Sequence, residues 1–367
     1  MDILLRGLIG GIFGLFHGTI LAIIIHELGH LVFGKLTGYS FVSFRVSSFI
    51  WFKEGEKIKF TRSKSMVAGQ CLMSPPEGAG KFKFVWYNLG GGVFNILLAA
   101  VWWGIYLIVV NAVSDGLHWI WGIFFAIGII GNIIIALLNL IPIVIAGMPN
   151  DGRNIREALK SEDAKRGLRL VFYVNSELAK GKKYRDFPPE LFALNEDADL
   201  NNYFVASMLL MEAEQLNDSG EYEAAINMCS RLNLKKLPAV YTNGVKLEQI
   251  YFYTVHQRDL EKAALIYNDK RIKAFFATSK TIEYAWTVAA YEHFGLGNKE
   301  KAQKTLTRAK SQAESHPNAG ERFMYKERLA HVAEAIEADK NQSEENDTTS
   351  LAELLKEANA WKEGERD

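Results

Sequence analysis

Three long apolar runs dominate the first 150 residues of the chain. They cover about residues 8–33, 85–110 and 117–142, and each offers the roughly 20 predominantly apolar residues that a helix needs to cross a bilayer. From the start of the second run to the end of the third, the only charged residue is Asp115. The pattern predicts three membrane-spanning helices. The alternative is that the runs are buried helices of a large soluble protein. Three such runs so close together argue against it.

A shorter segment with a different pattern separates the first two runs. Residues 39–52, YSFVSFRVSSFIWF, and residues 56–62, EKIKFTR, are rich in aromatic and β-branched side chains, which favour strands. The sequence KEGE at residues 53–56 between them is typical of a tight turn. We therefore predict a short β-hairpin at the membrane interface, ended by the chain-breaking sequence SPPEGAG at residues 74–80.

From about residue 156 onward the chain is polar enough to be soluble, and amphipathic segments recur along it. GEYEAAINMCSRL, RDLEKAALIYNDK and GNKEKAQKTLTRA align on Ala225, Ala263 and Ala302, at steps of 38 and 39 residues. Each is preceded by another amphipathic segment, as in stacked helix pairs. The pattern resembles tetratricopeptide repeats, whose period is about 34 residues. It predicts a helical repeat domain over residues 156–338, with a plain helical bundle as the alternative.

The last residues, 339–367, differ in composition from the predicted repeats. DKNQSEENDTTS, at residues 339–350, is polar and lacks large apolar side chains, which predicts a disordered linker. LAELLKEANAW, at residues 351–361, predicts a short amphipathic helix that packs on itself or on a partner. The chain is thus expected to end in a linker and a short amphipathic tail.

The charge distribution disfavours one class of partner and predicts an orientation in the membrane. Lys plus Arg and Asp plus Glu both number 42, so the net charge is zero, which argues against a nucleic-acid binder. Nine basic side chains and three glutamates lie in the loop of residues 34–83. Short loops rich in Lys and Arg stay on the cytoplasmic side of a membrane. We therefore expect the N-terminus outside, and the first loop and the carboxyl half in the cytoplasm.

Two histidines and a glutamate interrupt the first apolar run. Residues 26–30 read HELGH and fit the pattern H-E-x-x-H. On a helix, side chains four positions apart share a face, so His26 and His30 can hold one metal ion while Glu27 takes a proton from an attacking water. Ionisable groups inside a membrane need a partner, and zinc suits this ligand set. The pentapeptide also occurs by chance, but its place in an apolar run favours a metal site.

A zinc site of this kind needs a third protein ligand. The best candidate is Asp151, in the sequence NLIPIVIAGMPNDGR at the end of the third run, on the same side of the membrane as the histidines. Pro149 and Gly152 flank it and allow the chain to turn back toward the metal. A solvated turn at a helix end is the alternative. His17 falls on the opposite face of the first helix and is not a predicted ligand.

Three motifs together make residues 1 to about 155 resemble the site-2 protease family of intramembrane zinc metalloproteases. They are HELGH at residues 26–30, GGVFN at residues 91–95, and NLIP at residues 139–142 followed by Asp151 and Gly152. The spacer before Asp151 is longer than is usual in that family, and Asn150 stands where leucine is common. The resemblance does not extend to the carboxyl half.

This resemblance implies roles for five side chains. His26, His30 and Asp151 would be the zinc ligands, Glu27 the general base, and Asn139 a polar group that positions the substrate or its oxyanion. The fold class expected is mainly α: a three-helix membrane protease core over residues 1–155 with a small interfacial β-hairpin, then a soluble helical repeat domain.

The function that the resemblance implies is zinc-dependent cleavage of peptide bonds in or near transmembrane segments. The substrate would be a transmembrane protein or a signal-peptide-like remnant, and the repeat domain would recruit a cytoplasmic protein partner. The expected location is a bilayer, with a bacterial plasma membrane favoured. One alternative is a catalytically inert membrane-tethered adaptor that binds partners through its repeats. A small transporter that uses the buried His and Glu is another, although no inverted repeat is visible.

Overall fold

The structure is a computed structural model that describes residues 3–62, 68–78, 82–112 and 118–364. The described part is mostly helical, with three long apolar helical stretches and a small antiparallel sheet, so the mainly α prediction is confirmed at that level. The chain divides into two compact units, Met1–Val245 with Ser315–Arg322, and Lys246–Glu314 with Phe323–Asp367. The domain boundary predicted after residue 155 therefore falls inside the first unit.

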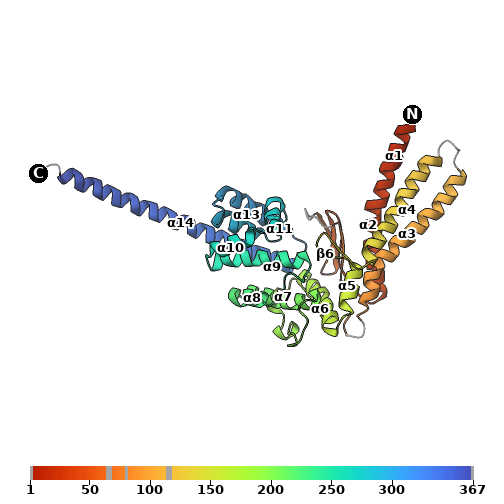
Figure 1. The fold of residues 1–367 in the computed structure, drawn as a ribbon, viewed down its shortest axis with the longest axis horizontal. Helices are drawn as coiled ribbons and strands as arrows, with labels where there is room; N and C mark the ends of the chain where they lie inside the picture. The colour runs from red at the N-terminus through yellow and green to blue at the C-terminus, as the bar shows by residue number, and fades with distance from the viewer. Residues whose placement is uncertain (1–2, 63–67, 79–81, 113–117, 365–367) are drawn as a thin grey trace. The chain divides into compact units, whose positions relative to one another are not determined.

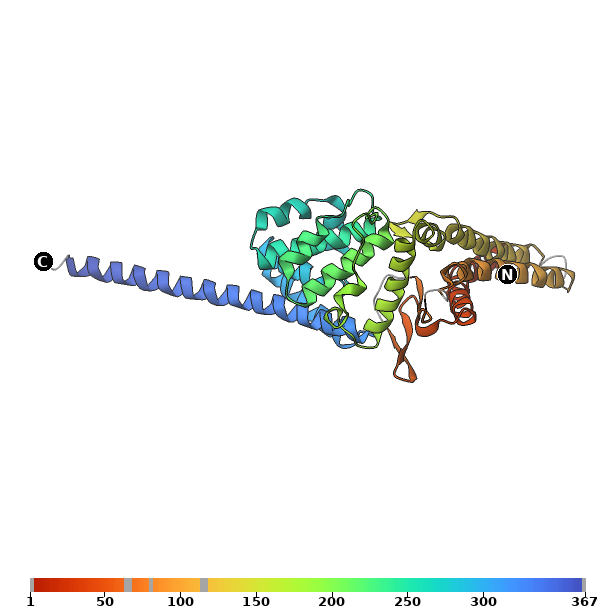
Figure 2. The ribbon, with the colours of Figure 1, turned by 90° about the horizontal axis from the view of Figure 1, so that it is seen from below.

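The three apolar runs form long helices in the first unit (Figures 1 and 2). The first comprises α1 (Ile3–Phe16), a π-helical turn (His17–Leu21) and α2 (Ala22–Leu36), and the others are α3 (Phe84–Ala112) and α4 (His118–Leu140). Gly7–Leu36, Phe84–Ala112 and His118–Leu140 are each long and apolar enough to cross a membrane. They agree with the three predicted spans and indicate a membrane protein.

Glycines let these helices approach closely. A Cβ atom added to Gly29 of α2 would lie 2.2 Å from the carbonyl oxygen of Gly90 in α3, and one added to Gly90 would lie 2.5 Å from that of Gly29. No real side chain fits at such distances, so the two backbones touch at this crossing. Small residues serve this purpose widely at helix contacts in membranes. The crossing lies within one turn of both histidines of the HELGH motif.

A four-stranded antiparallel sheet follows α2. Its strands are β1 (Ser40–Val46), β2 (Phe49–Glu54), β3 (Lys57–Arg62) and β4 (Gly69–Ser74), in the order β3-β2-β1-β4. The predicted hairpin is β2–β3, with Gly55 at its turn in a left-handed conformation (φ 58°). The segment expected to form its first strand is two strands, because the chain reverses at Ser47 (φ 52°). β4 completes the sheet and brings it against α2.

After α4 the chain stays at the end of the spans where the sheet lies, which we call the base of the spans. It then enters a layer of helices. The elements are β5 (Val144–Ile145), β6 (Met148–Pro149), α5 (Asp151–Ala158), α6 (Glu162–Ala179), short 3-10 turns at Tyr184–Asp186 and Pro189–Leu191, α7 (Tyr203–Asp218) and α8 (Tyr222–Cys229). β5 and β6 form a two-stranded hairpin that takes up most of the long spacer before Asp151.

One hydrophobic core joins this helical layer to the sheet and to the base of the spans. The rings of Tyr39 and Tyr87 pack edge-on against the ring of Phe172 in α6, at centroid distances of 6.2 and 5.0 Å. The Ser176 hydroxyl of α6 donates to the Ser74 hydroxyl of β4 over 3.1 Å. The same buried core contains Tyr39, Cys71, Met73, Phe82, Tyr87, Leu168, Phe204, Leu209 and Ala225. Helices α6–α8 are therefore continuous with the membrane part of the first unit.

The remaining helices include the other segments of the predicted repeat. They are α9 (Ala239–Tyr251) with a π-helical turn (Phe252–His256), α10 (Leu260–Tyr267), α11 (Lys270–Thr278), α12 (Ala285–Phe294), α13 (Lys299–Glu314) and α14 (Ala319–Gly364). Ala225, Ala263 and Ala302 lie on α8, α10 and α13 and are all fully or almost fully buried. The relation to tetratricopeptide repeats stays a prediction, and α11 adds a helix between two of the aligned segments.

Helix α14 runs through residues 339–350, where the sequence analysis expected a disordered linker. The segment contains neither glycine nor proline, so nothing in its composition interrupts a helix that already begins at Ala319. Polarity alone therefore did not distinguish a linker from the solvated continuation of a helix.

Candidate metal centre

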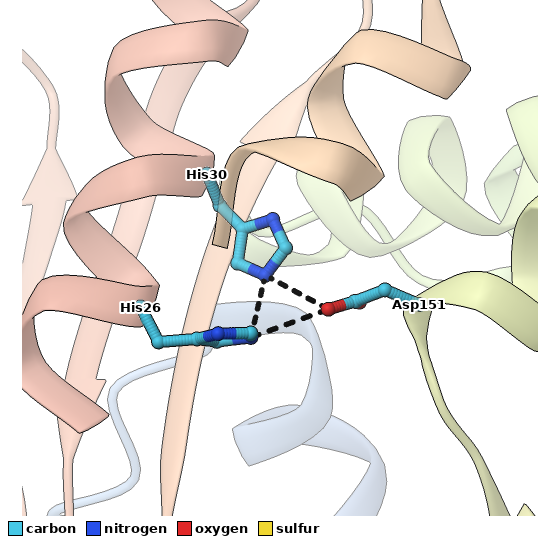
Figure 3. Close-up of side chains that lie close together, drawn as sticks. All are labelled: His26, His30 and Asp151. Carbon is cyan, nitrogen blue, oxygen red and sulfur yellow. Dashed lines mark hydrogen bonds and ion pairs between the residues drawn. The ribbon is translucent and has the colours of Figure 1, made fainter. Parts of the chain in front are cut away.

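His26, His30 and Asp151 converge although they come from distant parts of the sequence (Figure 3). The histidines lie one turn apart on α2, and Asp151 is the first residue of α5. The two Nε2 atoms are 3.2 Å apart, and the Asp151 Oδ2 atom lies 3.2 Å from His26 Nε2 and 3.4 Å from His30 Nε2. Both histidines are buried, with 7% and 5% of their surface exposed. We call these three residues the His–His–Asp cluster.

The hydrogen bonds of His26 determine which of its ring nitrogens carries the proton. Its Nδ1 atom lies 2.8 Å from Asn95 Oδ1. The Asn95 amide group donates to the Ala22 carbonyl oxygen and to Asn132 Oδ1, over 2.9 and 3.0 Å. Asn95 Oδ1 is therefore an acceptor, and His26 Nδ1 must donate. The lone pair of His26 Nε2 is left pointing into the cluster.

His30 is held in the same tautomer by a backbone group. Its Nδ1 atom lies 2.8 Å from the carbonyl oxygen of Tyr87, which can only accept. The Tyr87 hydroxyl donates to the Cys71 carbonyl oxygen in β4, so the same residue links α3 to the sheet. Metal-binding histidines commonly donate their second ring N–H in this way, which fixes the ring and directs its lone pair.

With both imidazoles neutral, the cluster contains three acceptors and no proton between them. Burial raises the pKa of the Asp151 carboxyl, but in the metal-free cluster positive charge on the imidazoles and hydrogen bonds from their Nε2 atoms outweigh that effect and hold its pKa below the usual range, so the group is a carboxylate. Its Oδ2 atom is buried and lies against both Nε2 atoms. Three converging lone pairs repel one another unless a cation lies between them.

The spacing of these atoms fits a tetrahedral metal shell. Zn–N and Zn–O bonds of about 2.0–2.1 Å at tetrahedral angles place neighbouring ligand atoms about 3.3–3.4 Å apart. The three separations in the cluster are 3.2, 3.2 and 3.4 Å. Among the described residues, this is the group of histidine, cysteine and acidic side chains with the geometry to hold a metal ion. Three protein ligands leave a fourth tetrahedral position free.

Glu27 lies beside the cluster, between α2 and the sheet. It is 7% exposed and interacts electrostatically with His30, His26 and Asp151, while the backbone N–H of Cys71 donates to its carboxylate. A Cβ atom added to Gly69 of β4 would lie 2.5 Å from Glu27 Oε1. Only glycine at position 69 leaves room for the carboxylate, so β4 forms one wall of its surroundings.

Glycines also bring the backbone against the metal-site residues. A Cβ atom added to Gly91 of α3 would lie 2.5 Å from the His26 ring, and one added to Gly152 would lie 2.2 Å from the carbonyl oxygen of Leu140. The first contact seats the imidazole directly on the α3 backbone. The second packs the start of α5, and with it Asp151, on the end of α4.

The structure brings four of the five predicted site residues together and places the fifth elsewhere. The Asn139 amide donates to the Ile135 carbonyl oxygen of its own helix over 2.9 Å, and its described contacts include none with the His–His–Asp cluster. The asparagines that do support the cluster are Asn95 and Asn132, both fully buried. Asn95 ends the GGVFN motif of the resemblance, but no role was predicted for either asparagine. An amide inside an apolar span is itself a signal, because it needs a partner.

His17 takes no part in the cluster. Its Nδ1 atom lies 2.8 Å from the Phe13 carbonyl oxygen, and its ring lies edge-on to Trp102 and Phe124, with centroids 5.1 and 4.8 Å away. It therefore faces the neighbouring helices.

Comparison with known proteins adds no relative to this description. The chain matches no protein-family profile, no curated protein and no solved structure.

Proposed function

We propose that the protein is an intramembrane zinc-dependent endopeptidase of the site-2 protease type. The observation that carries the proposal is the convergence of two imidazole nitrogens and one carboxylate oxygen at the spacing of a tetrahedral shell, with Glu27 beside them. All but Asp151 lie in a helix long and apolar enough to span a membrane. A structural histidine pair would not need a carboxylate base next to an open ligand position.

Zinc is the metal that this ligand set favours. Two imidazoles and one carboxylate, with a fourth position open, are typical of catalytic zinc sites, whereas magnesium and calcium prefer oxygen ligands. When bound, zinc supplies a Lewis acid that polarises the scissile carbonyl and lowers the pKa of water. His26, His30 and Asp151 would hold it, and the fixed tautomers of the histidines suit that role.

Glu27 would act as the general base. Its carboxylate would take the proton of the attacking water and pass it to the leaving amide nitrogen, so the proton stays within the site. The substrate would be a transmembrane segment, locally unwound because a helix hides its carbonyl groups in its own hydrogen bonds. β4 is the strand nearest to Glu27, so an extended substrate would pass close to Gly69 and Cys71.

The orientation belongs to the same proposal. The basic loop between the first two spans places the N-terminus outside and the sheet, the cluster end of α2 and the helical layer on the cytoplasmic side. A bacterial plasma membrane suits this arrangement. The helices after α5 would then present a cytoplasmic surface for a substrate region or a protein partner.

The test combines metal content with a substrate trap. The purified full-length protein is expected to bind about one zinc per chain. Glu27→Gln should retain the zinc and lower proteolysis by roughly 10²–10⁴-fold, the usual contribution of a general base. Comparative membrane proteomics of cells with the wild type and with Glu27→Gln should reveal a membrane protein that accumulates only with the variant.

Glu56→Gln is the matched control, because Glu56 lies in the exposed β2–β3 turn. Processing that continues at the wild-type rate with Glu27→Gln would contradict the enzyme and favour the adaptor that binds partners through its helices. A wild-type protein without zinc would contradict the metal site itself.

A further inference from the structure

The third ligand reaches the cluster only through an unusual turn. The chain leaves α4 at Leu140, forms the β5–β6 hairpin over residues 144–149, and must then reverse so that Asp151 points back at the histidines. A spacer of this kind has many conformations, and most of them would leave the carboxylate away from the two Nε2 atoms. Something must therefore fix the path of residues 141–150 relative to both α4 and α5.

The side chain of Asn150 connects all three elements. Its amide group donates to the carbonyl oxygens of Leu138, in the last turn of α4, and of Ile141, just after that helix, over 2.5 and 2.6 Å. Its Oδ1 atom accepts from the backbone N–H of Arg153 in α5, over 2.8 Å, and from that of Ile143 before β5, over 3.3 Å. The residue is 8% exposed. It thus uses both amide hydrogens and both acceptor lone pairs.

These bonds join groups that helix ends leave without partners. The last carbonyl groups of α4 and the first N–H groups of α5 have no intrahelical bonds of their own. Asn150 is the N-cap of α5 and also closes the end of α4, and its backbone N–H donates to Ile143 over 3.3 Å. A shorter cap such as serine could serve α5 but could not also reach α4. The next residue along the chain is the ligand Asp151.

We propose that Asn150 is a positioning residue for the metal centre: its side chain ties the end of α4 to the start of α5 and thereby holds Asp151 at the distance the ion requires. This inference depends on the proposed zinc site. It assigns Asn150 no contact with metal or substrate. Loss of the side chain is expected to weaken zinc binding by about 10–100-fold, the range measured for residues that orient metal ligands.

The experiment measures zinc affinity of the full-length protein in detergent by competition with a chromophoric chelator. Asn150→Ala removes all four bonds, and Asn150→Ser keeps an acceptor for the N-cap of α5 while removing the bridge to α4. Ser161→Ala is the matched control, because Ser161 caps the neighbouring helix α6 through its bond to the Ala164 N–H. The visible absorption of the Co²⁺-loaded proteins reports the coordination geometry independently.

Both Asn150 variants are expected to lose affinity and to show an altered Co²⁺ spectrum, whereas Ser161→Ala binds within about twofold of the wild type. Wild-type affinity and spectrum in Asn150→Ser, or an equal loss in Ser161→Ala, would overturn the inference. If Asn150→Ala does not fold, Asn150→Ser alone decides. Wild-type protein that takes up no zinc would overturn the proposed function together with this inference, whereas zinc binding unaffected by the Asn150 variants would overturn only the latter.

Discussion

The His–His–Asp cluster of the first unit and the buried acids of the second unit balance their charges in different ways. In the second unit, Glu248 lies 2.7 Å from the guanidinium of Arg328, which also lies over the Trp286 ring. Glu292 is 1% exposed and contacts Lys301 over 2.9 Å and the Thr305 hydroxyl over 2.8 Å. Each of these buried acids has a cation from the chain itself.

The His–His–Asp cluster of the first unit has no such partner. Its three inward atoms are acceptors, and the N–H groups of its histidines point outward to Asn95 and to the Tyr87 carbonyl. A structural ion pair and the proposed metal site therefore differ in the same fold. The ion pair is complete within the sequence, whereas the proposed site, with neutral imidazoles, has an excess of lone pairs that a bound metal ion would satisfy.

Arg328→Met should cause the largest change, and it should be a change in stability. Removing the guanidinium takes away the ion pair of Arg328 with the buried Glu248 carboxylate, and breaking a buried pair on one side typically costs about 3–5 kcal/mol of unfolding free energy. Urea or guanidinium titration of the full-length protein measures this loss. The double variant Glu248→Met with Arg328→Met should recover most of it, because a well-packed apolar pair often replaces a buried ion pair. Equal losses in the single and double variants would contradict this account.

Asp151→Asn should change metal binding as well as stability. Zinc affinity is expected to fall by more than about 100-fold, or about 2.7 kcal/mol, because a ligand is lost and not merely its support. The metal-free protein should be less stable than the wild type at neutral pH, since the lowered pKa of Asp151 means that its carboxylate interacts favourably with the imidazoles. Chelator competition and thermal unfolding of the metal-free protein measure the two effects. Unchanged zinc affinity would exclude Asp151 as a ligand.

Asn95→Ala should have a smaller effect on the same equilibrium. His26 Nδ1 loses its acceptor, so the ring is no longer fixed in the metal-binding tautomer, and zinc affinity should fall by about 10–100-fold. Asn111→Ala on the same helix is the control, because the Asn111 amide is exposed and, among the described residues, its side chain bonds to the Leu107 carbonyl of α3. Similar zinc affinities for the two variants would show that the Asn95 contact does not support the site.

The smallest expected effect is a pH dependence in the second unit. Burial, together with the nearby positive groups of His331, Arg328 and Arg258, lowers the pKa of His256 to about 4. The unfolded chain, with a histidine pKa near 6.5, therefore binds more protons between pH 4 and 6.5. Stability should be greatest above pH 6.5 and should fall as the pH drops toward 4. Unfolding midpoints of the wild type and His256→Gln across this range would test it, since the variant should lose part of the slope.

The sequence indicated the chemistry of the site better than its geometry. His26, Glu27 and His30 follow from local spacing on one helix, and the three spans follow from apolar length alone. Asp151 could be proposed from its place at the end of the third run and from a resemblance, but its approach to the histidines depends on the β5–β6 hairpin and on Asn150. The hairpin is held by backbone hydrogen bonds, and the Asn150 side chain bonds to backbone groups. No sequence pattern specifies either set of bonds.

The helical layer shows a second limit of reading local patterns. Residues 156 onward are amphipathic and polar enough to predict a separate soluble domain. The apolar face of α6 instead packs on Tyr39 and Tyr87 through Phe172, in one core that also contains Met73 and residues of α7. Periodicity shows that a helix has an apolar face but does not identify what that face contacts. β4 was missed for a related reason, since GQCLMS is short and begins with glycine.

The shared core around Phe172 determines which fragments of the protein can fold on their own. A chain that stops after residue 155 would uncover the aromatic rings of Tyr39 and Tyr87, and a chain that begins there would expose the apolar side of α6 to water. Neither fragment should behave as an autonomous module. Tyr87 packs in this core and also orients His30 through its carbonyl group. A cut after residue 155 would therefore disturb the His–His–Asp cluster as well as the helical layer.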